Sequence, residues 1–172
     1  MRTYIDSTVL VAVYVPERFS NAARQTVRGV PQVPFTLLHE LEVPNAFELL
    51  VGRGSISREE CRAIHAQLQD DLDSQRLARV PVDLDRVFMM AIDLSRTYTV
   101  KALTRSLDLL HVAAARVMMC SAFASADDRQ LAVAKATGLK VVDIKRRPRR
   151  RKSSRRGTFN SLGAIRKNLR QS

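Results

Sequence analysis

Short apolar segments typical of β-strands alternate with longer segments of helical spacing along most of this chain. The strand-like segments are RTYID (2–6), QVPFT (32–36), RLARVPV (76–82), SAFAS (121–125) and LKVVDI (139–144). At least one segment of helical spacing separates each of them from the next. Parallel strands need such crossover connections, and a parallel sheet is covered by helices on both faces. The alternation therefore predicts a three-layer α/β/α sandwich around a five-stranded parallel sheet.

Capping residues and apolar spacing locate the helices. Ser57 and Glu60 have the spacing of a capping box, which predicts a helix that starts beside them. An apolar stripe at helical spacing follows: Cys61, Ile64, Leu68 and Leu72. Residues 37–54 also have helical spacing, but Pro44 lies inside them. Proline lacks the N–H that a helix interior needs, so we expect this helix to begin near Leu41 or to kink there.

Composition limits the classes of protein that this chain can be. Its 172 residues are 45% apolar, which fits one globular domain with a core of its own. No apolar run approaches the roughly 18 residues of a membrane helix, and the N-terminus lacks the pattern of a secretory signal. The two cysteines form no C-x-x-C pair, and the three histidines have no zinc-site spacing. We expect a cytoplasmic protein without a membrane partner.

The formal net charge of +12 comes from one end of the chain. Twelve of the 29 lysines and arginines lie in residues 145–172, which contain no acid, so residues 1–144 balance the other 17 bases against all 17 acids. We therefore predict a folded domain over 1–144 and a solvated, flexible basic tail over 145–172. This tail is either a nonspecific RNA or DNA tether or an incidental extension. Both interpretations stay open.

Four acids are predicted to lie at one edge of the sheet. Asp6 ends the first strand and Asp127 follows the fourth, while Glu42 and Asp108 lie near the starts of two helices. Functional groups of open α/β sheets gather beyond the carboxyl ends of the strands. Carboxylates crowded together repel one another unless a cation compensates them, and Mg²⁺ or Mn²⁺ prefers such oxygen ligands. The pattern predicts a metal site made of these four residues.

Each acid taken alone has a simpler interpretation. Asp6 could be a helix N-cap, and so could Asp127 or its neighbour Asp128. Glu42 could be a solvated helix residue. Asp108 is the hardest to explain in this way, because apolar residues surround it in the sequence and a buried unpaired carboxylate is costly.

Four segments of the chain resemble, in order and spacing, the four motifs of PIN-domain proteins, and most of all the VapC-type toxins of bacterial toxin–antitoxin systems. The segments are YIDSTVLVAVYV, TLLHELEVPNAFELL, LTRSLDLLHVAAA and FASADDRQLAVAKATGLKVV. The resemblance spans residues 2–144 and leaves the basic tail unmatched. It implies a parallel α/β/α fold, metal-dependent RNA cleavage, a homodimer and a cognate antitoxin protein as partner.

By this resemblance Asp6, Glu42, Asp108 and Asp127 take the acidic metal-binding positions. The family's glutamate lies six residues after a serine or threonine, as Glu42 follows Thr36, and Glu40 does not fit that spacing. The sequence S-A-D matches the family's T-x-D, which selects Asp127 over Asp128. Three departures from the motifs are Ser125 in place of the usual threonine, Ala126 where an aromatic residue is common, and Pro44.

The implied reaction is hydrolysis of an RNA phosphodiester by a metal-activated water. Further candidates in that site are residues that could orient a metal ligand or contact the substrate: Ser7, Thr8, Asn45, Thr104, Arg105 and Asp128. His111, one turn after Asp108, is expected to be a hydrogen-bonded helix residue and not a catalyst. Two other functions stay open: a catalytically silent module that binds nucleic acid or a partner through the basic tail, and a structure-specific DNA nuclease.

Overall fold

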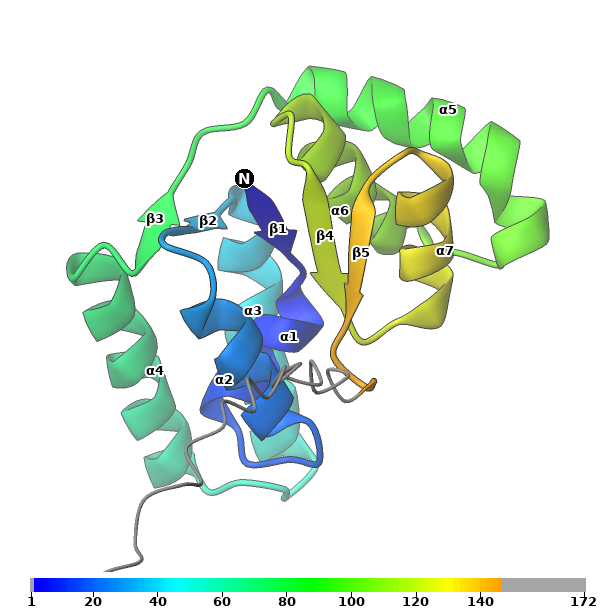
Figure 1. The fold of residues 1–172 in the computed structure, drawn as a ribbon. Helices are drawn as coiled ribbons and strands as arrows, with labels where there is room; N and C mark the ends of the chain where they lie inside the picture. The colour runs from blue at the N-terminus through cyan, green and yellow to red at the C-terminus, as the bar shows by residue number, and fades with distance from the viewer. Residues whose placement is uncertain (1, 147–172) are drawn as a thin grey trace, which may run out of the picture.

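The computed structural model describes residues 2–146 and contains the alternating strands and helices expected from the sequence (Figure 1). The strands are β1 (Thr3–Ile5), β2 (Val33–Phe35), β3 (Leu77–Arg79), β4 (Ala122–Ser125) and β5 (Lys140–Asp143). The helices are α1 (Ser7–Tyr14), α2 (Ser20–Arg28), α3 (Leu37–Gly52), α4 (Arg58–Asp73), α5 (Leu84–Ala102), α6 (Ser106–Val117) and α7 (Asp128–Ala136). Of the predicted basic tail, residues 147–172 lie outside the described part.

All five predicted strands are present and parallel, but they form two sheets. One has the order β1-β4-β5, and the other pairs β2 with β3. The backbone ladder is interrupted between β1 and β2, although the two strands are neighbours in space. The single five-stranded sheet expected from the sequence is therefore divided into three strands and two.

Proline and histidine side chains account for this division. The N–H of Val33 donates to Arg76 beside β3, so the nitrogen of the next residue, Pro34, faces the β1 side, and it carries no hydrogen. On β1 the carbonyl of Ile5 accepts a hydrogen bond from Nε2 of His39, at 2.8 Å. A side chain thus replaces a bond that a strand would supply.

Two apolar cores cover the two faces of the strands, which gives the three predicted layers. Tyr4 and Phe123 belong to the core formed with α5, α6 and α7. Their neighbours Ile5 and Ala124 belong to the core formed with α1, α2, α3 and α4. This is the two-residue alternation of a sheet buried on both faces. Figure 1 shows the two groups of helices on opposite sides of β1 and β4.

Helix α4 begins as predicted, and α3 does not. Ser57 and Glu60 form the capping box of α4, and its apolar stripe is buried. Helix α3 begins at Leu37, so the expected start near Leu41 is wrong. Pro44 leaves only the carbonyl of Glu40 without its helical donor, and Glu40 is exposed, so water can satisfy that carbonyl.

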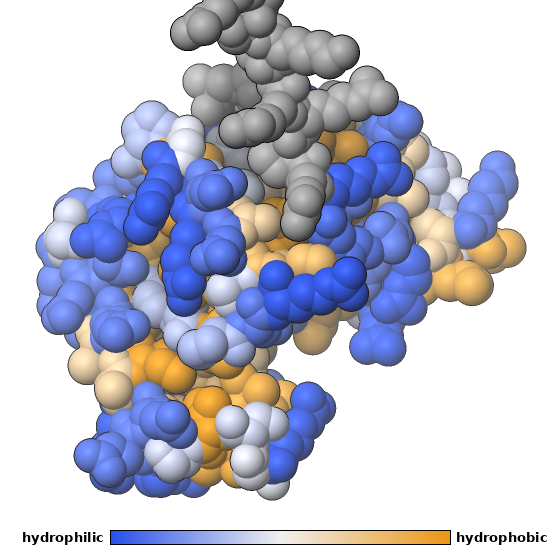
Figure 2. Space-filling view, turned by 60° about the horizontal axis from the view of Figure 1, so that its bottom comes forward, coloured by the Kyte–Doolittle hydropathy of each residue, from blue (hydrophilic) through white to orange (hydrophobic). Residues whose placement is uncertain are grey.

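The face of the molecule in Figure 2 carries hydrophilic side chains with hydrophobic areas between them. Several large apolar residues are exposed, among them Leu41, Leu49 and Leu107. Within residues 2–146, no helix is both long enough and apolar enough to cross a membrane.

Candidate active site

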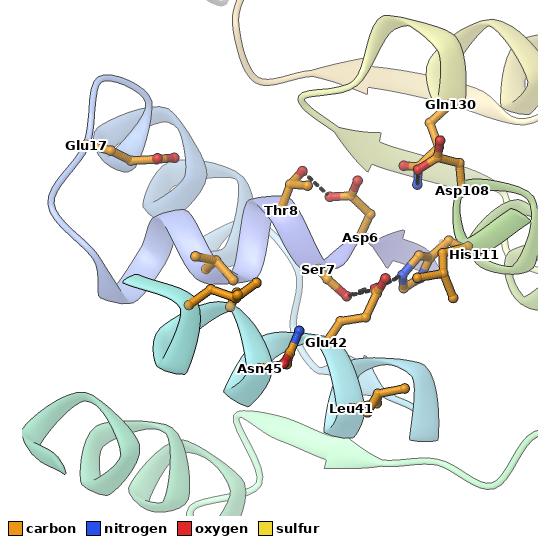
Figure 3. Close-up of a pocket in the computed structure, with 14 residues that line it drawn as sticks. Asp6, Ser7, Thr8, Glu17, Leu41, Glu42, Asn45, Asp108, His111 and Gln130 are labelled. Carbon is orange, nitrogen blue, oxygen red and sulfur yellow. Dashed lines mark hydrogen bonds and ion pairs between the residues drawn. The ribbon is translucent and has the colours of Figure 1, made fainter. Parts of the chain in front are cut away.

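A cavity of about 510 Å³ opens at the carboxyl end of β1 (Figure 3). Helices α1, α3, α6 and α7 each contribute side chains to its wall. The polar lining residues are Asp6, Ser7, Thr8, Glu17, Glu42, Asn45, Asp108, His111 and Gln130. Three of the four predicted acids thus face one cavity, and Asp127 is not among its lining residues.

Asp6 is the most buried of these carboxylates, with 1% of its surface exposed. It is the N-cap of α1, where Oδ1 accepts hydrogen bonds from the N–H of Val9 at 3.1 Å and the hydroxyl of Thr8 at 2.8 Å. Oδ2 accepts a hydrogen bond from Ser125 at 2.7 Å. Burial outweighs the charge of His111 and these bonds and raises the pKa of Asp6 above its ordinary value.

Glu42 is held by side chains from α1 and α6. Its Oε2 accepts a hydrogen bond from Ser7 at 2.6 Å and lies in hydrogen-bond contact with Nε2 of His111. Burial tends to raise the pKa of Glu42, but the hydrogen bonds and charge of His111 and the hydroxyl of Ser7 outweigh it, so the pKa lies below its ordinary value. This carboxylate is therefore ionised at neutral pH.

His111 is held at both ring nitrogens. Burial raises the pKa of Tyr4 above its usual range, so the phenol stays protonated, and its oxygen lies in hydrogen-bond contact with Nδ1 of His111 at 2.8 Å. Nε2 carries a hydrogen and donates it to the Glu42 carboxylate, which can only accept. The expectation that His111 is a hydrogen-bonded helix residue is confirmed, and its ring also forms part of the cavity wall.

Asp108 faces the cavity from the first turn of α6. One oxygen accepts the backbone N–H of Arg105, the N-cap, at 3.0 Å, and the other accepts Nε2 of Gln130 at 3.4 Å. Oε1 of Gln130 is buried and has no hydrogen-bond partner among residues 2–146. An orphaned oxygen beside a half-buried carboxylate is a polar arrangement that suits a bound cation or its water.

Asp127 is connected to this site through Ser125. Oγ of Ser125 donates to Asp6 and accepts the backbone N–H of Asp127 at 2.9 Å. Asp127 is the N-cap of α7 and forms a salt bridge of 3.1 Å with Arg129. Burial tends to raise its pKa, but the bonds from Arg129 and two backbone N–H groups outweigh burial and lower it. Asp128 is exposed and pairs with Lys145 at 2.7 Å.

Some of the secondary candidates line the cavity and others do not. Ser7, Thr8 and Asn45 line the cavity, whereas Thr104 and Arg105 are not among its lining residues. The hydroxyl of Thr104 is buried and finds no hydrogen-bond partner in the described part of the chain. Glu40, rejected on spacing, points to Arg79 in a 3.1 Å salt bridge, away from Glu42.

The donor chemistry of this cavity fits a hard divalent cation. Asp6 forms no salt bridge with any residue of 2–146, although it is buried and carries two oxygens. The four predicted acids do not, however, meet as a group: within the described residues, only Glu48, Cys61 and His65 bring three ligand atoms within 4.8 Å of one another. Internal partners account for the separation, because Ser7 and His111 hold Glu42 and Arg129 holds Asp127.

Sequence reasoning did not identify every polar group of this site. Gln130 and Glu17 line the cavity, and Arg129 covers Asp127. Gln130 lies three residues after Asp127, on the first turn of α7, and that spacing was the available signal. Nothing in the sequence marks Glu17, which follows α1 in a loop.

No protein-family model and no curated protein matches this chain. Solved structures do match. FitAcB from Neisseria gonorrhoeae is similar with a TM-score of 0.61 and 14% identity, over 83% of this chain and 98% of that one. A toxin–antitoxin complex from Klebsiella pneumoniae gives a TM-score of 0.57 and 14% identity, over 84% and 98% of the two chains.

The chain shares the fold of these proteins. The α/β/α class predicted from the alternation of strands and helices is thereby confirmed.

Proposed function

We propose that this protein is a Mg²⁺-dependent endoribonuclease that acts as the toxin of a toxin–antitoxin pair. The strongest support is the cavity that brings Asp6, Glu42 and Asp108 together at the carboxyl end of β1. Asp6 is buried there without a salt-bridge partner among residues 2–146, which favours a cation. One of the similar structures is a toxin–antitoxin complex, which favours the biological role.

Asp6, Glu42, Asp108 and Asp127 would hold Mg²⁺, or Mn²⁺ in its place. When bound there, the ion would supply a water of lowered pKa and would offset the negative charge of the phosphate. Ser7 and His111 fix the direction of the Glu42 carboxylate and keep it ionised. Asn45 lies on the exposed side of α3 at the cavity, where its amide can donate to a phosphate oxygen.

The antitoxin would cover the same opening. Leu41, Leu49 and Leu107 are exposed and line the cavity beside the acids. A peptide with apolar side chains for these leucines and a basic side chain for the carboxylates would complement that surface and exclude RNA. We expect the toxin itself to be a homodimer in solution, which sedimentation of the purified chain tests.

The experiment is cleavage of RNA by the purified chain with Mg²⁺, and then with EDTA. We expect chelator-sensitive cleavage that is lost in Asp6→Asn, in Asp108→Asn and in Glu42→Gln, with the thermal unfolding profile still cooperative. Glu40→Gln is the matched control, because Glu40 lies on the same helix but pairs with Arg79 at the surface. Activity retained in both Asp6→Asn and Asp108→Asn would reject the site.

A second candidate is a catalytically silent module that binds nucleic acid. The internal bonds that hold Glu42 and Asp127 favour it, because those carboxylates are already satisfied. Deletion of residues 145–172 separates the two functions. A binding module that works through its basic tail loses nearly all RNA affinity, whereas a nuclease keeps EDTA-sensitive turnover. Parallel assays on RNA and DNA oligonucleotides distinguish a DNA nuclease from both.

A further inference from the structure

Three potential metal ligands meet between α3 and α4, away from the cavity. Glu48 lies on α3, and Cys61 and His65 lie on α4. One donor atom from each of them falls within 4.8 Å of the other two. Cys61 and His65 are four residues apart, so both lie on the helix face that packs against α3. None of the three lines the candidate active site.

Two of the three separations between these atoms match the edges of a tetrahedral site, and the third is within 4.8 Å. Sγ of Cys61 lies 3.6 Å from Oε1 of Glu48, and Nε2 of His65 lies 3.5 Å from the same oxygen. A zinc ion with bonds of about 2.3 Å to sulfur and about 2.0 to 2.1 Å to nitrogen and oxygen places tetrahedral ligands roughly 3.3 to 3.6 Å apart. The distance between His65 and Glu48 is also long for a hydrogen bond.

Neighbouring side chains orient these ligands. Arg58 binds Oε2 of Glu48 at 2.5 Å and leaves Oε1 directed at the other two residues. The ring of His65 meets Phe47 edge to face, with centroids 5.4 Å apart. Cys61 is 1% exposed, whereas 49% of the Glu48 side chain is open to solvent. One side of the cluster is therefore closed by the core, and the other admits water as a fourth ligand.

We propose that Glu48, Cys61 and His65 form a Zn²⁺ site that joins α3 to α4. Mixed sulfur, nitrogen and oxygen donors suit zinc and exclude Mg²⁺, which prefers oxygen alone. Zinc binding forms a bond to Sγ and releases the thiol proton to solvent. Burial and the nearby Glu48 charge raise the pKa of Cys61, so without the ion the side chain remains a neutral thiol. Within the cluster, Glu48 and the thiolate offset the charge of the ion.

The test uses Co²⁺ as a spectroscopic probe on the full-length, reduced, chelator-treated protein. We expect one equivalent of Co²⁺ to produce the near-ultraviolet charge-transfer band of a cobalt–thiolate bond, and added Zn²⁺ to remove it. In Cys61→Ser the band should disappear. In His65→Gln and Glu48→Gln the Co²⁺ affinity should fall by at least about tenfold. Cys120→Ser is the control, because Cys120 is a second buried cysteine outside this cluster.

Two outcomes would overturn the proposal: no thiolate band in the wild-type protein, or a band that survives in Cys61→Ser. The Asp6→Asn variant separates this site from the candidate active site. Because Asp6 is not part of the cluster, the band should persist there even when RNA cleavage is lost. A wild-type protein that shows no thiolate band but cleaves RNA in an EDTA-sensitive way would reject the zinc site and leave the nuclease proposal intact.

Discussion

Acid should destabilise this protein through the buried side chain of His39. The backbone N–H of Thr36 donates to Nδ1 at 2.9 Å, and Nε2 contacts the carbonyl of Ile5 at 2.8 Å. Nδ1 must therefore be an acceptor and Nε2 a donor, which is the neutral tautomer. A second proton on the ring, at Nδ1, would point at the N–H of Thr36 and replace this hydrogen bond with repulsion between two donors. Burial and the charge of His111 lower the pKa of His39 to about 3.

The size of the effect follows from linkage. The unfolded chain binds a proton at His39 with a pKa of about 6.5, and the folded chain does so only near about 3. Because the folded pKa is the lower one, the contribution of His39 is complete above about pH 6.5 and is lost as the pH falls toward about 3. Between pH 7 and pH 5 the free energy of unfolding should fall by about 2 kcal/mol from this residue alone.

Urea unfolding at pH 7 and pH 5, followed by circular dichroism, measures that difference. The glutamine of His39→Gln keeps one donor and one acceptor but does not titrate. Between pH 7 and pH 5, the free energy of unfolding of this variant should therefore fall by about 2 kcal/mol less than that of the wild type. An equal loss of stability in the wild type and in His39→Gln would refute the reasoning.

Three further perturbations test the local chemistry by chemical unfolding and RNA cleavage. Burial raises the pKa of Asp6 in the folded protein, so the contribution of Asp6 to stability is present at low pH and is lost as the pH rises through that pKa. At pH 7, Asp6→Asn should therefore unfold at a higher urea concentration than the metal-free wild type. The same variant should lose RNA cleavage. Ser57→Ala removes the cap of α4 and should cost about 1 kcal/mol of unfolding free energy, without changing cleavage. Ser125→Ala leaves an oxygen of Asp6 and the N–H of Asp127 without their hydrogen-bond partner. The free energy of unfolding should fall by about 1–3 kcal/mol, and cleavage should decrease as well. Unchanged stability would show that the two hydrogen bonds of Ser125 do not stabilise the fold.

Local signals in the sequence were sufficient for the strands and most helices. The capping box of Ser57 and Glu60 and the apolar stripe behind it are local features, and the structure has both. Asp6 and Asp127 were each interpreted either as a metal ligand or as a helix N-cap. In the structure both residues are N-caps. Whether these residues also bind metal stays a prediction.

What the sequence could not provide depends on contacts between distant segments. The division of the sheet requires knowing that Pro34 faces β1 and that His39 takes the Ile5 carbonyl. Of the two outcomes expected from Pro44, a start near Leu41 or a kink there, the start is four residues late, because the rest of the helix can offset a single lost helical bond at an exposed carbonyl. The cluster of Glu48 with Cys61 and His65 was missed because it depends on a contact between distant segments: its acidic member lies on another helix.

Capping and metal binding are compatible at Asp6, and the count of lone pairs indicates why. A carboxylate offers about four acceptor positions. Val9, Thr8 and Ser125 use three of them, so one position on Oδ2 remains for a cation. Asp127 differs, because Arg129 binds both of its oxygens. Asp6 can therefore receive an ion as it stands, whereas Asp127 can do so only if the side chain of Arg129 moves aside.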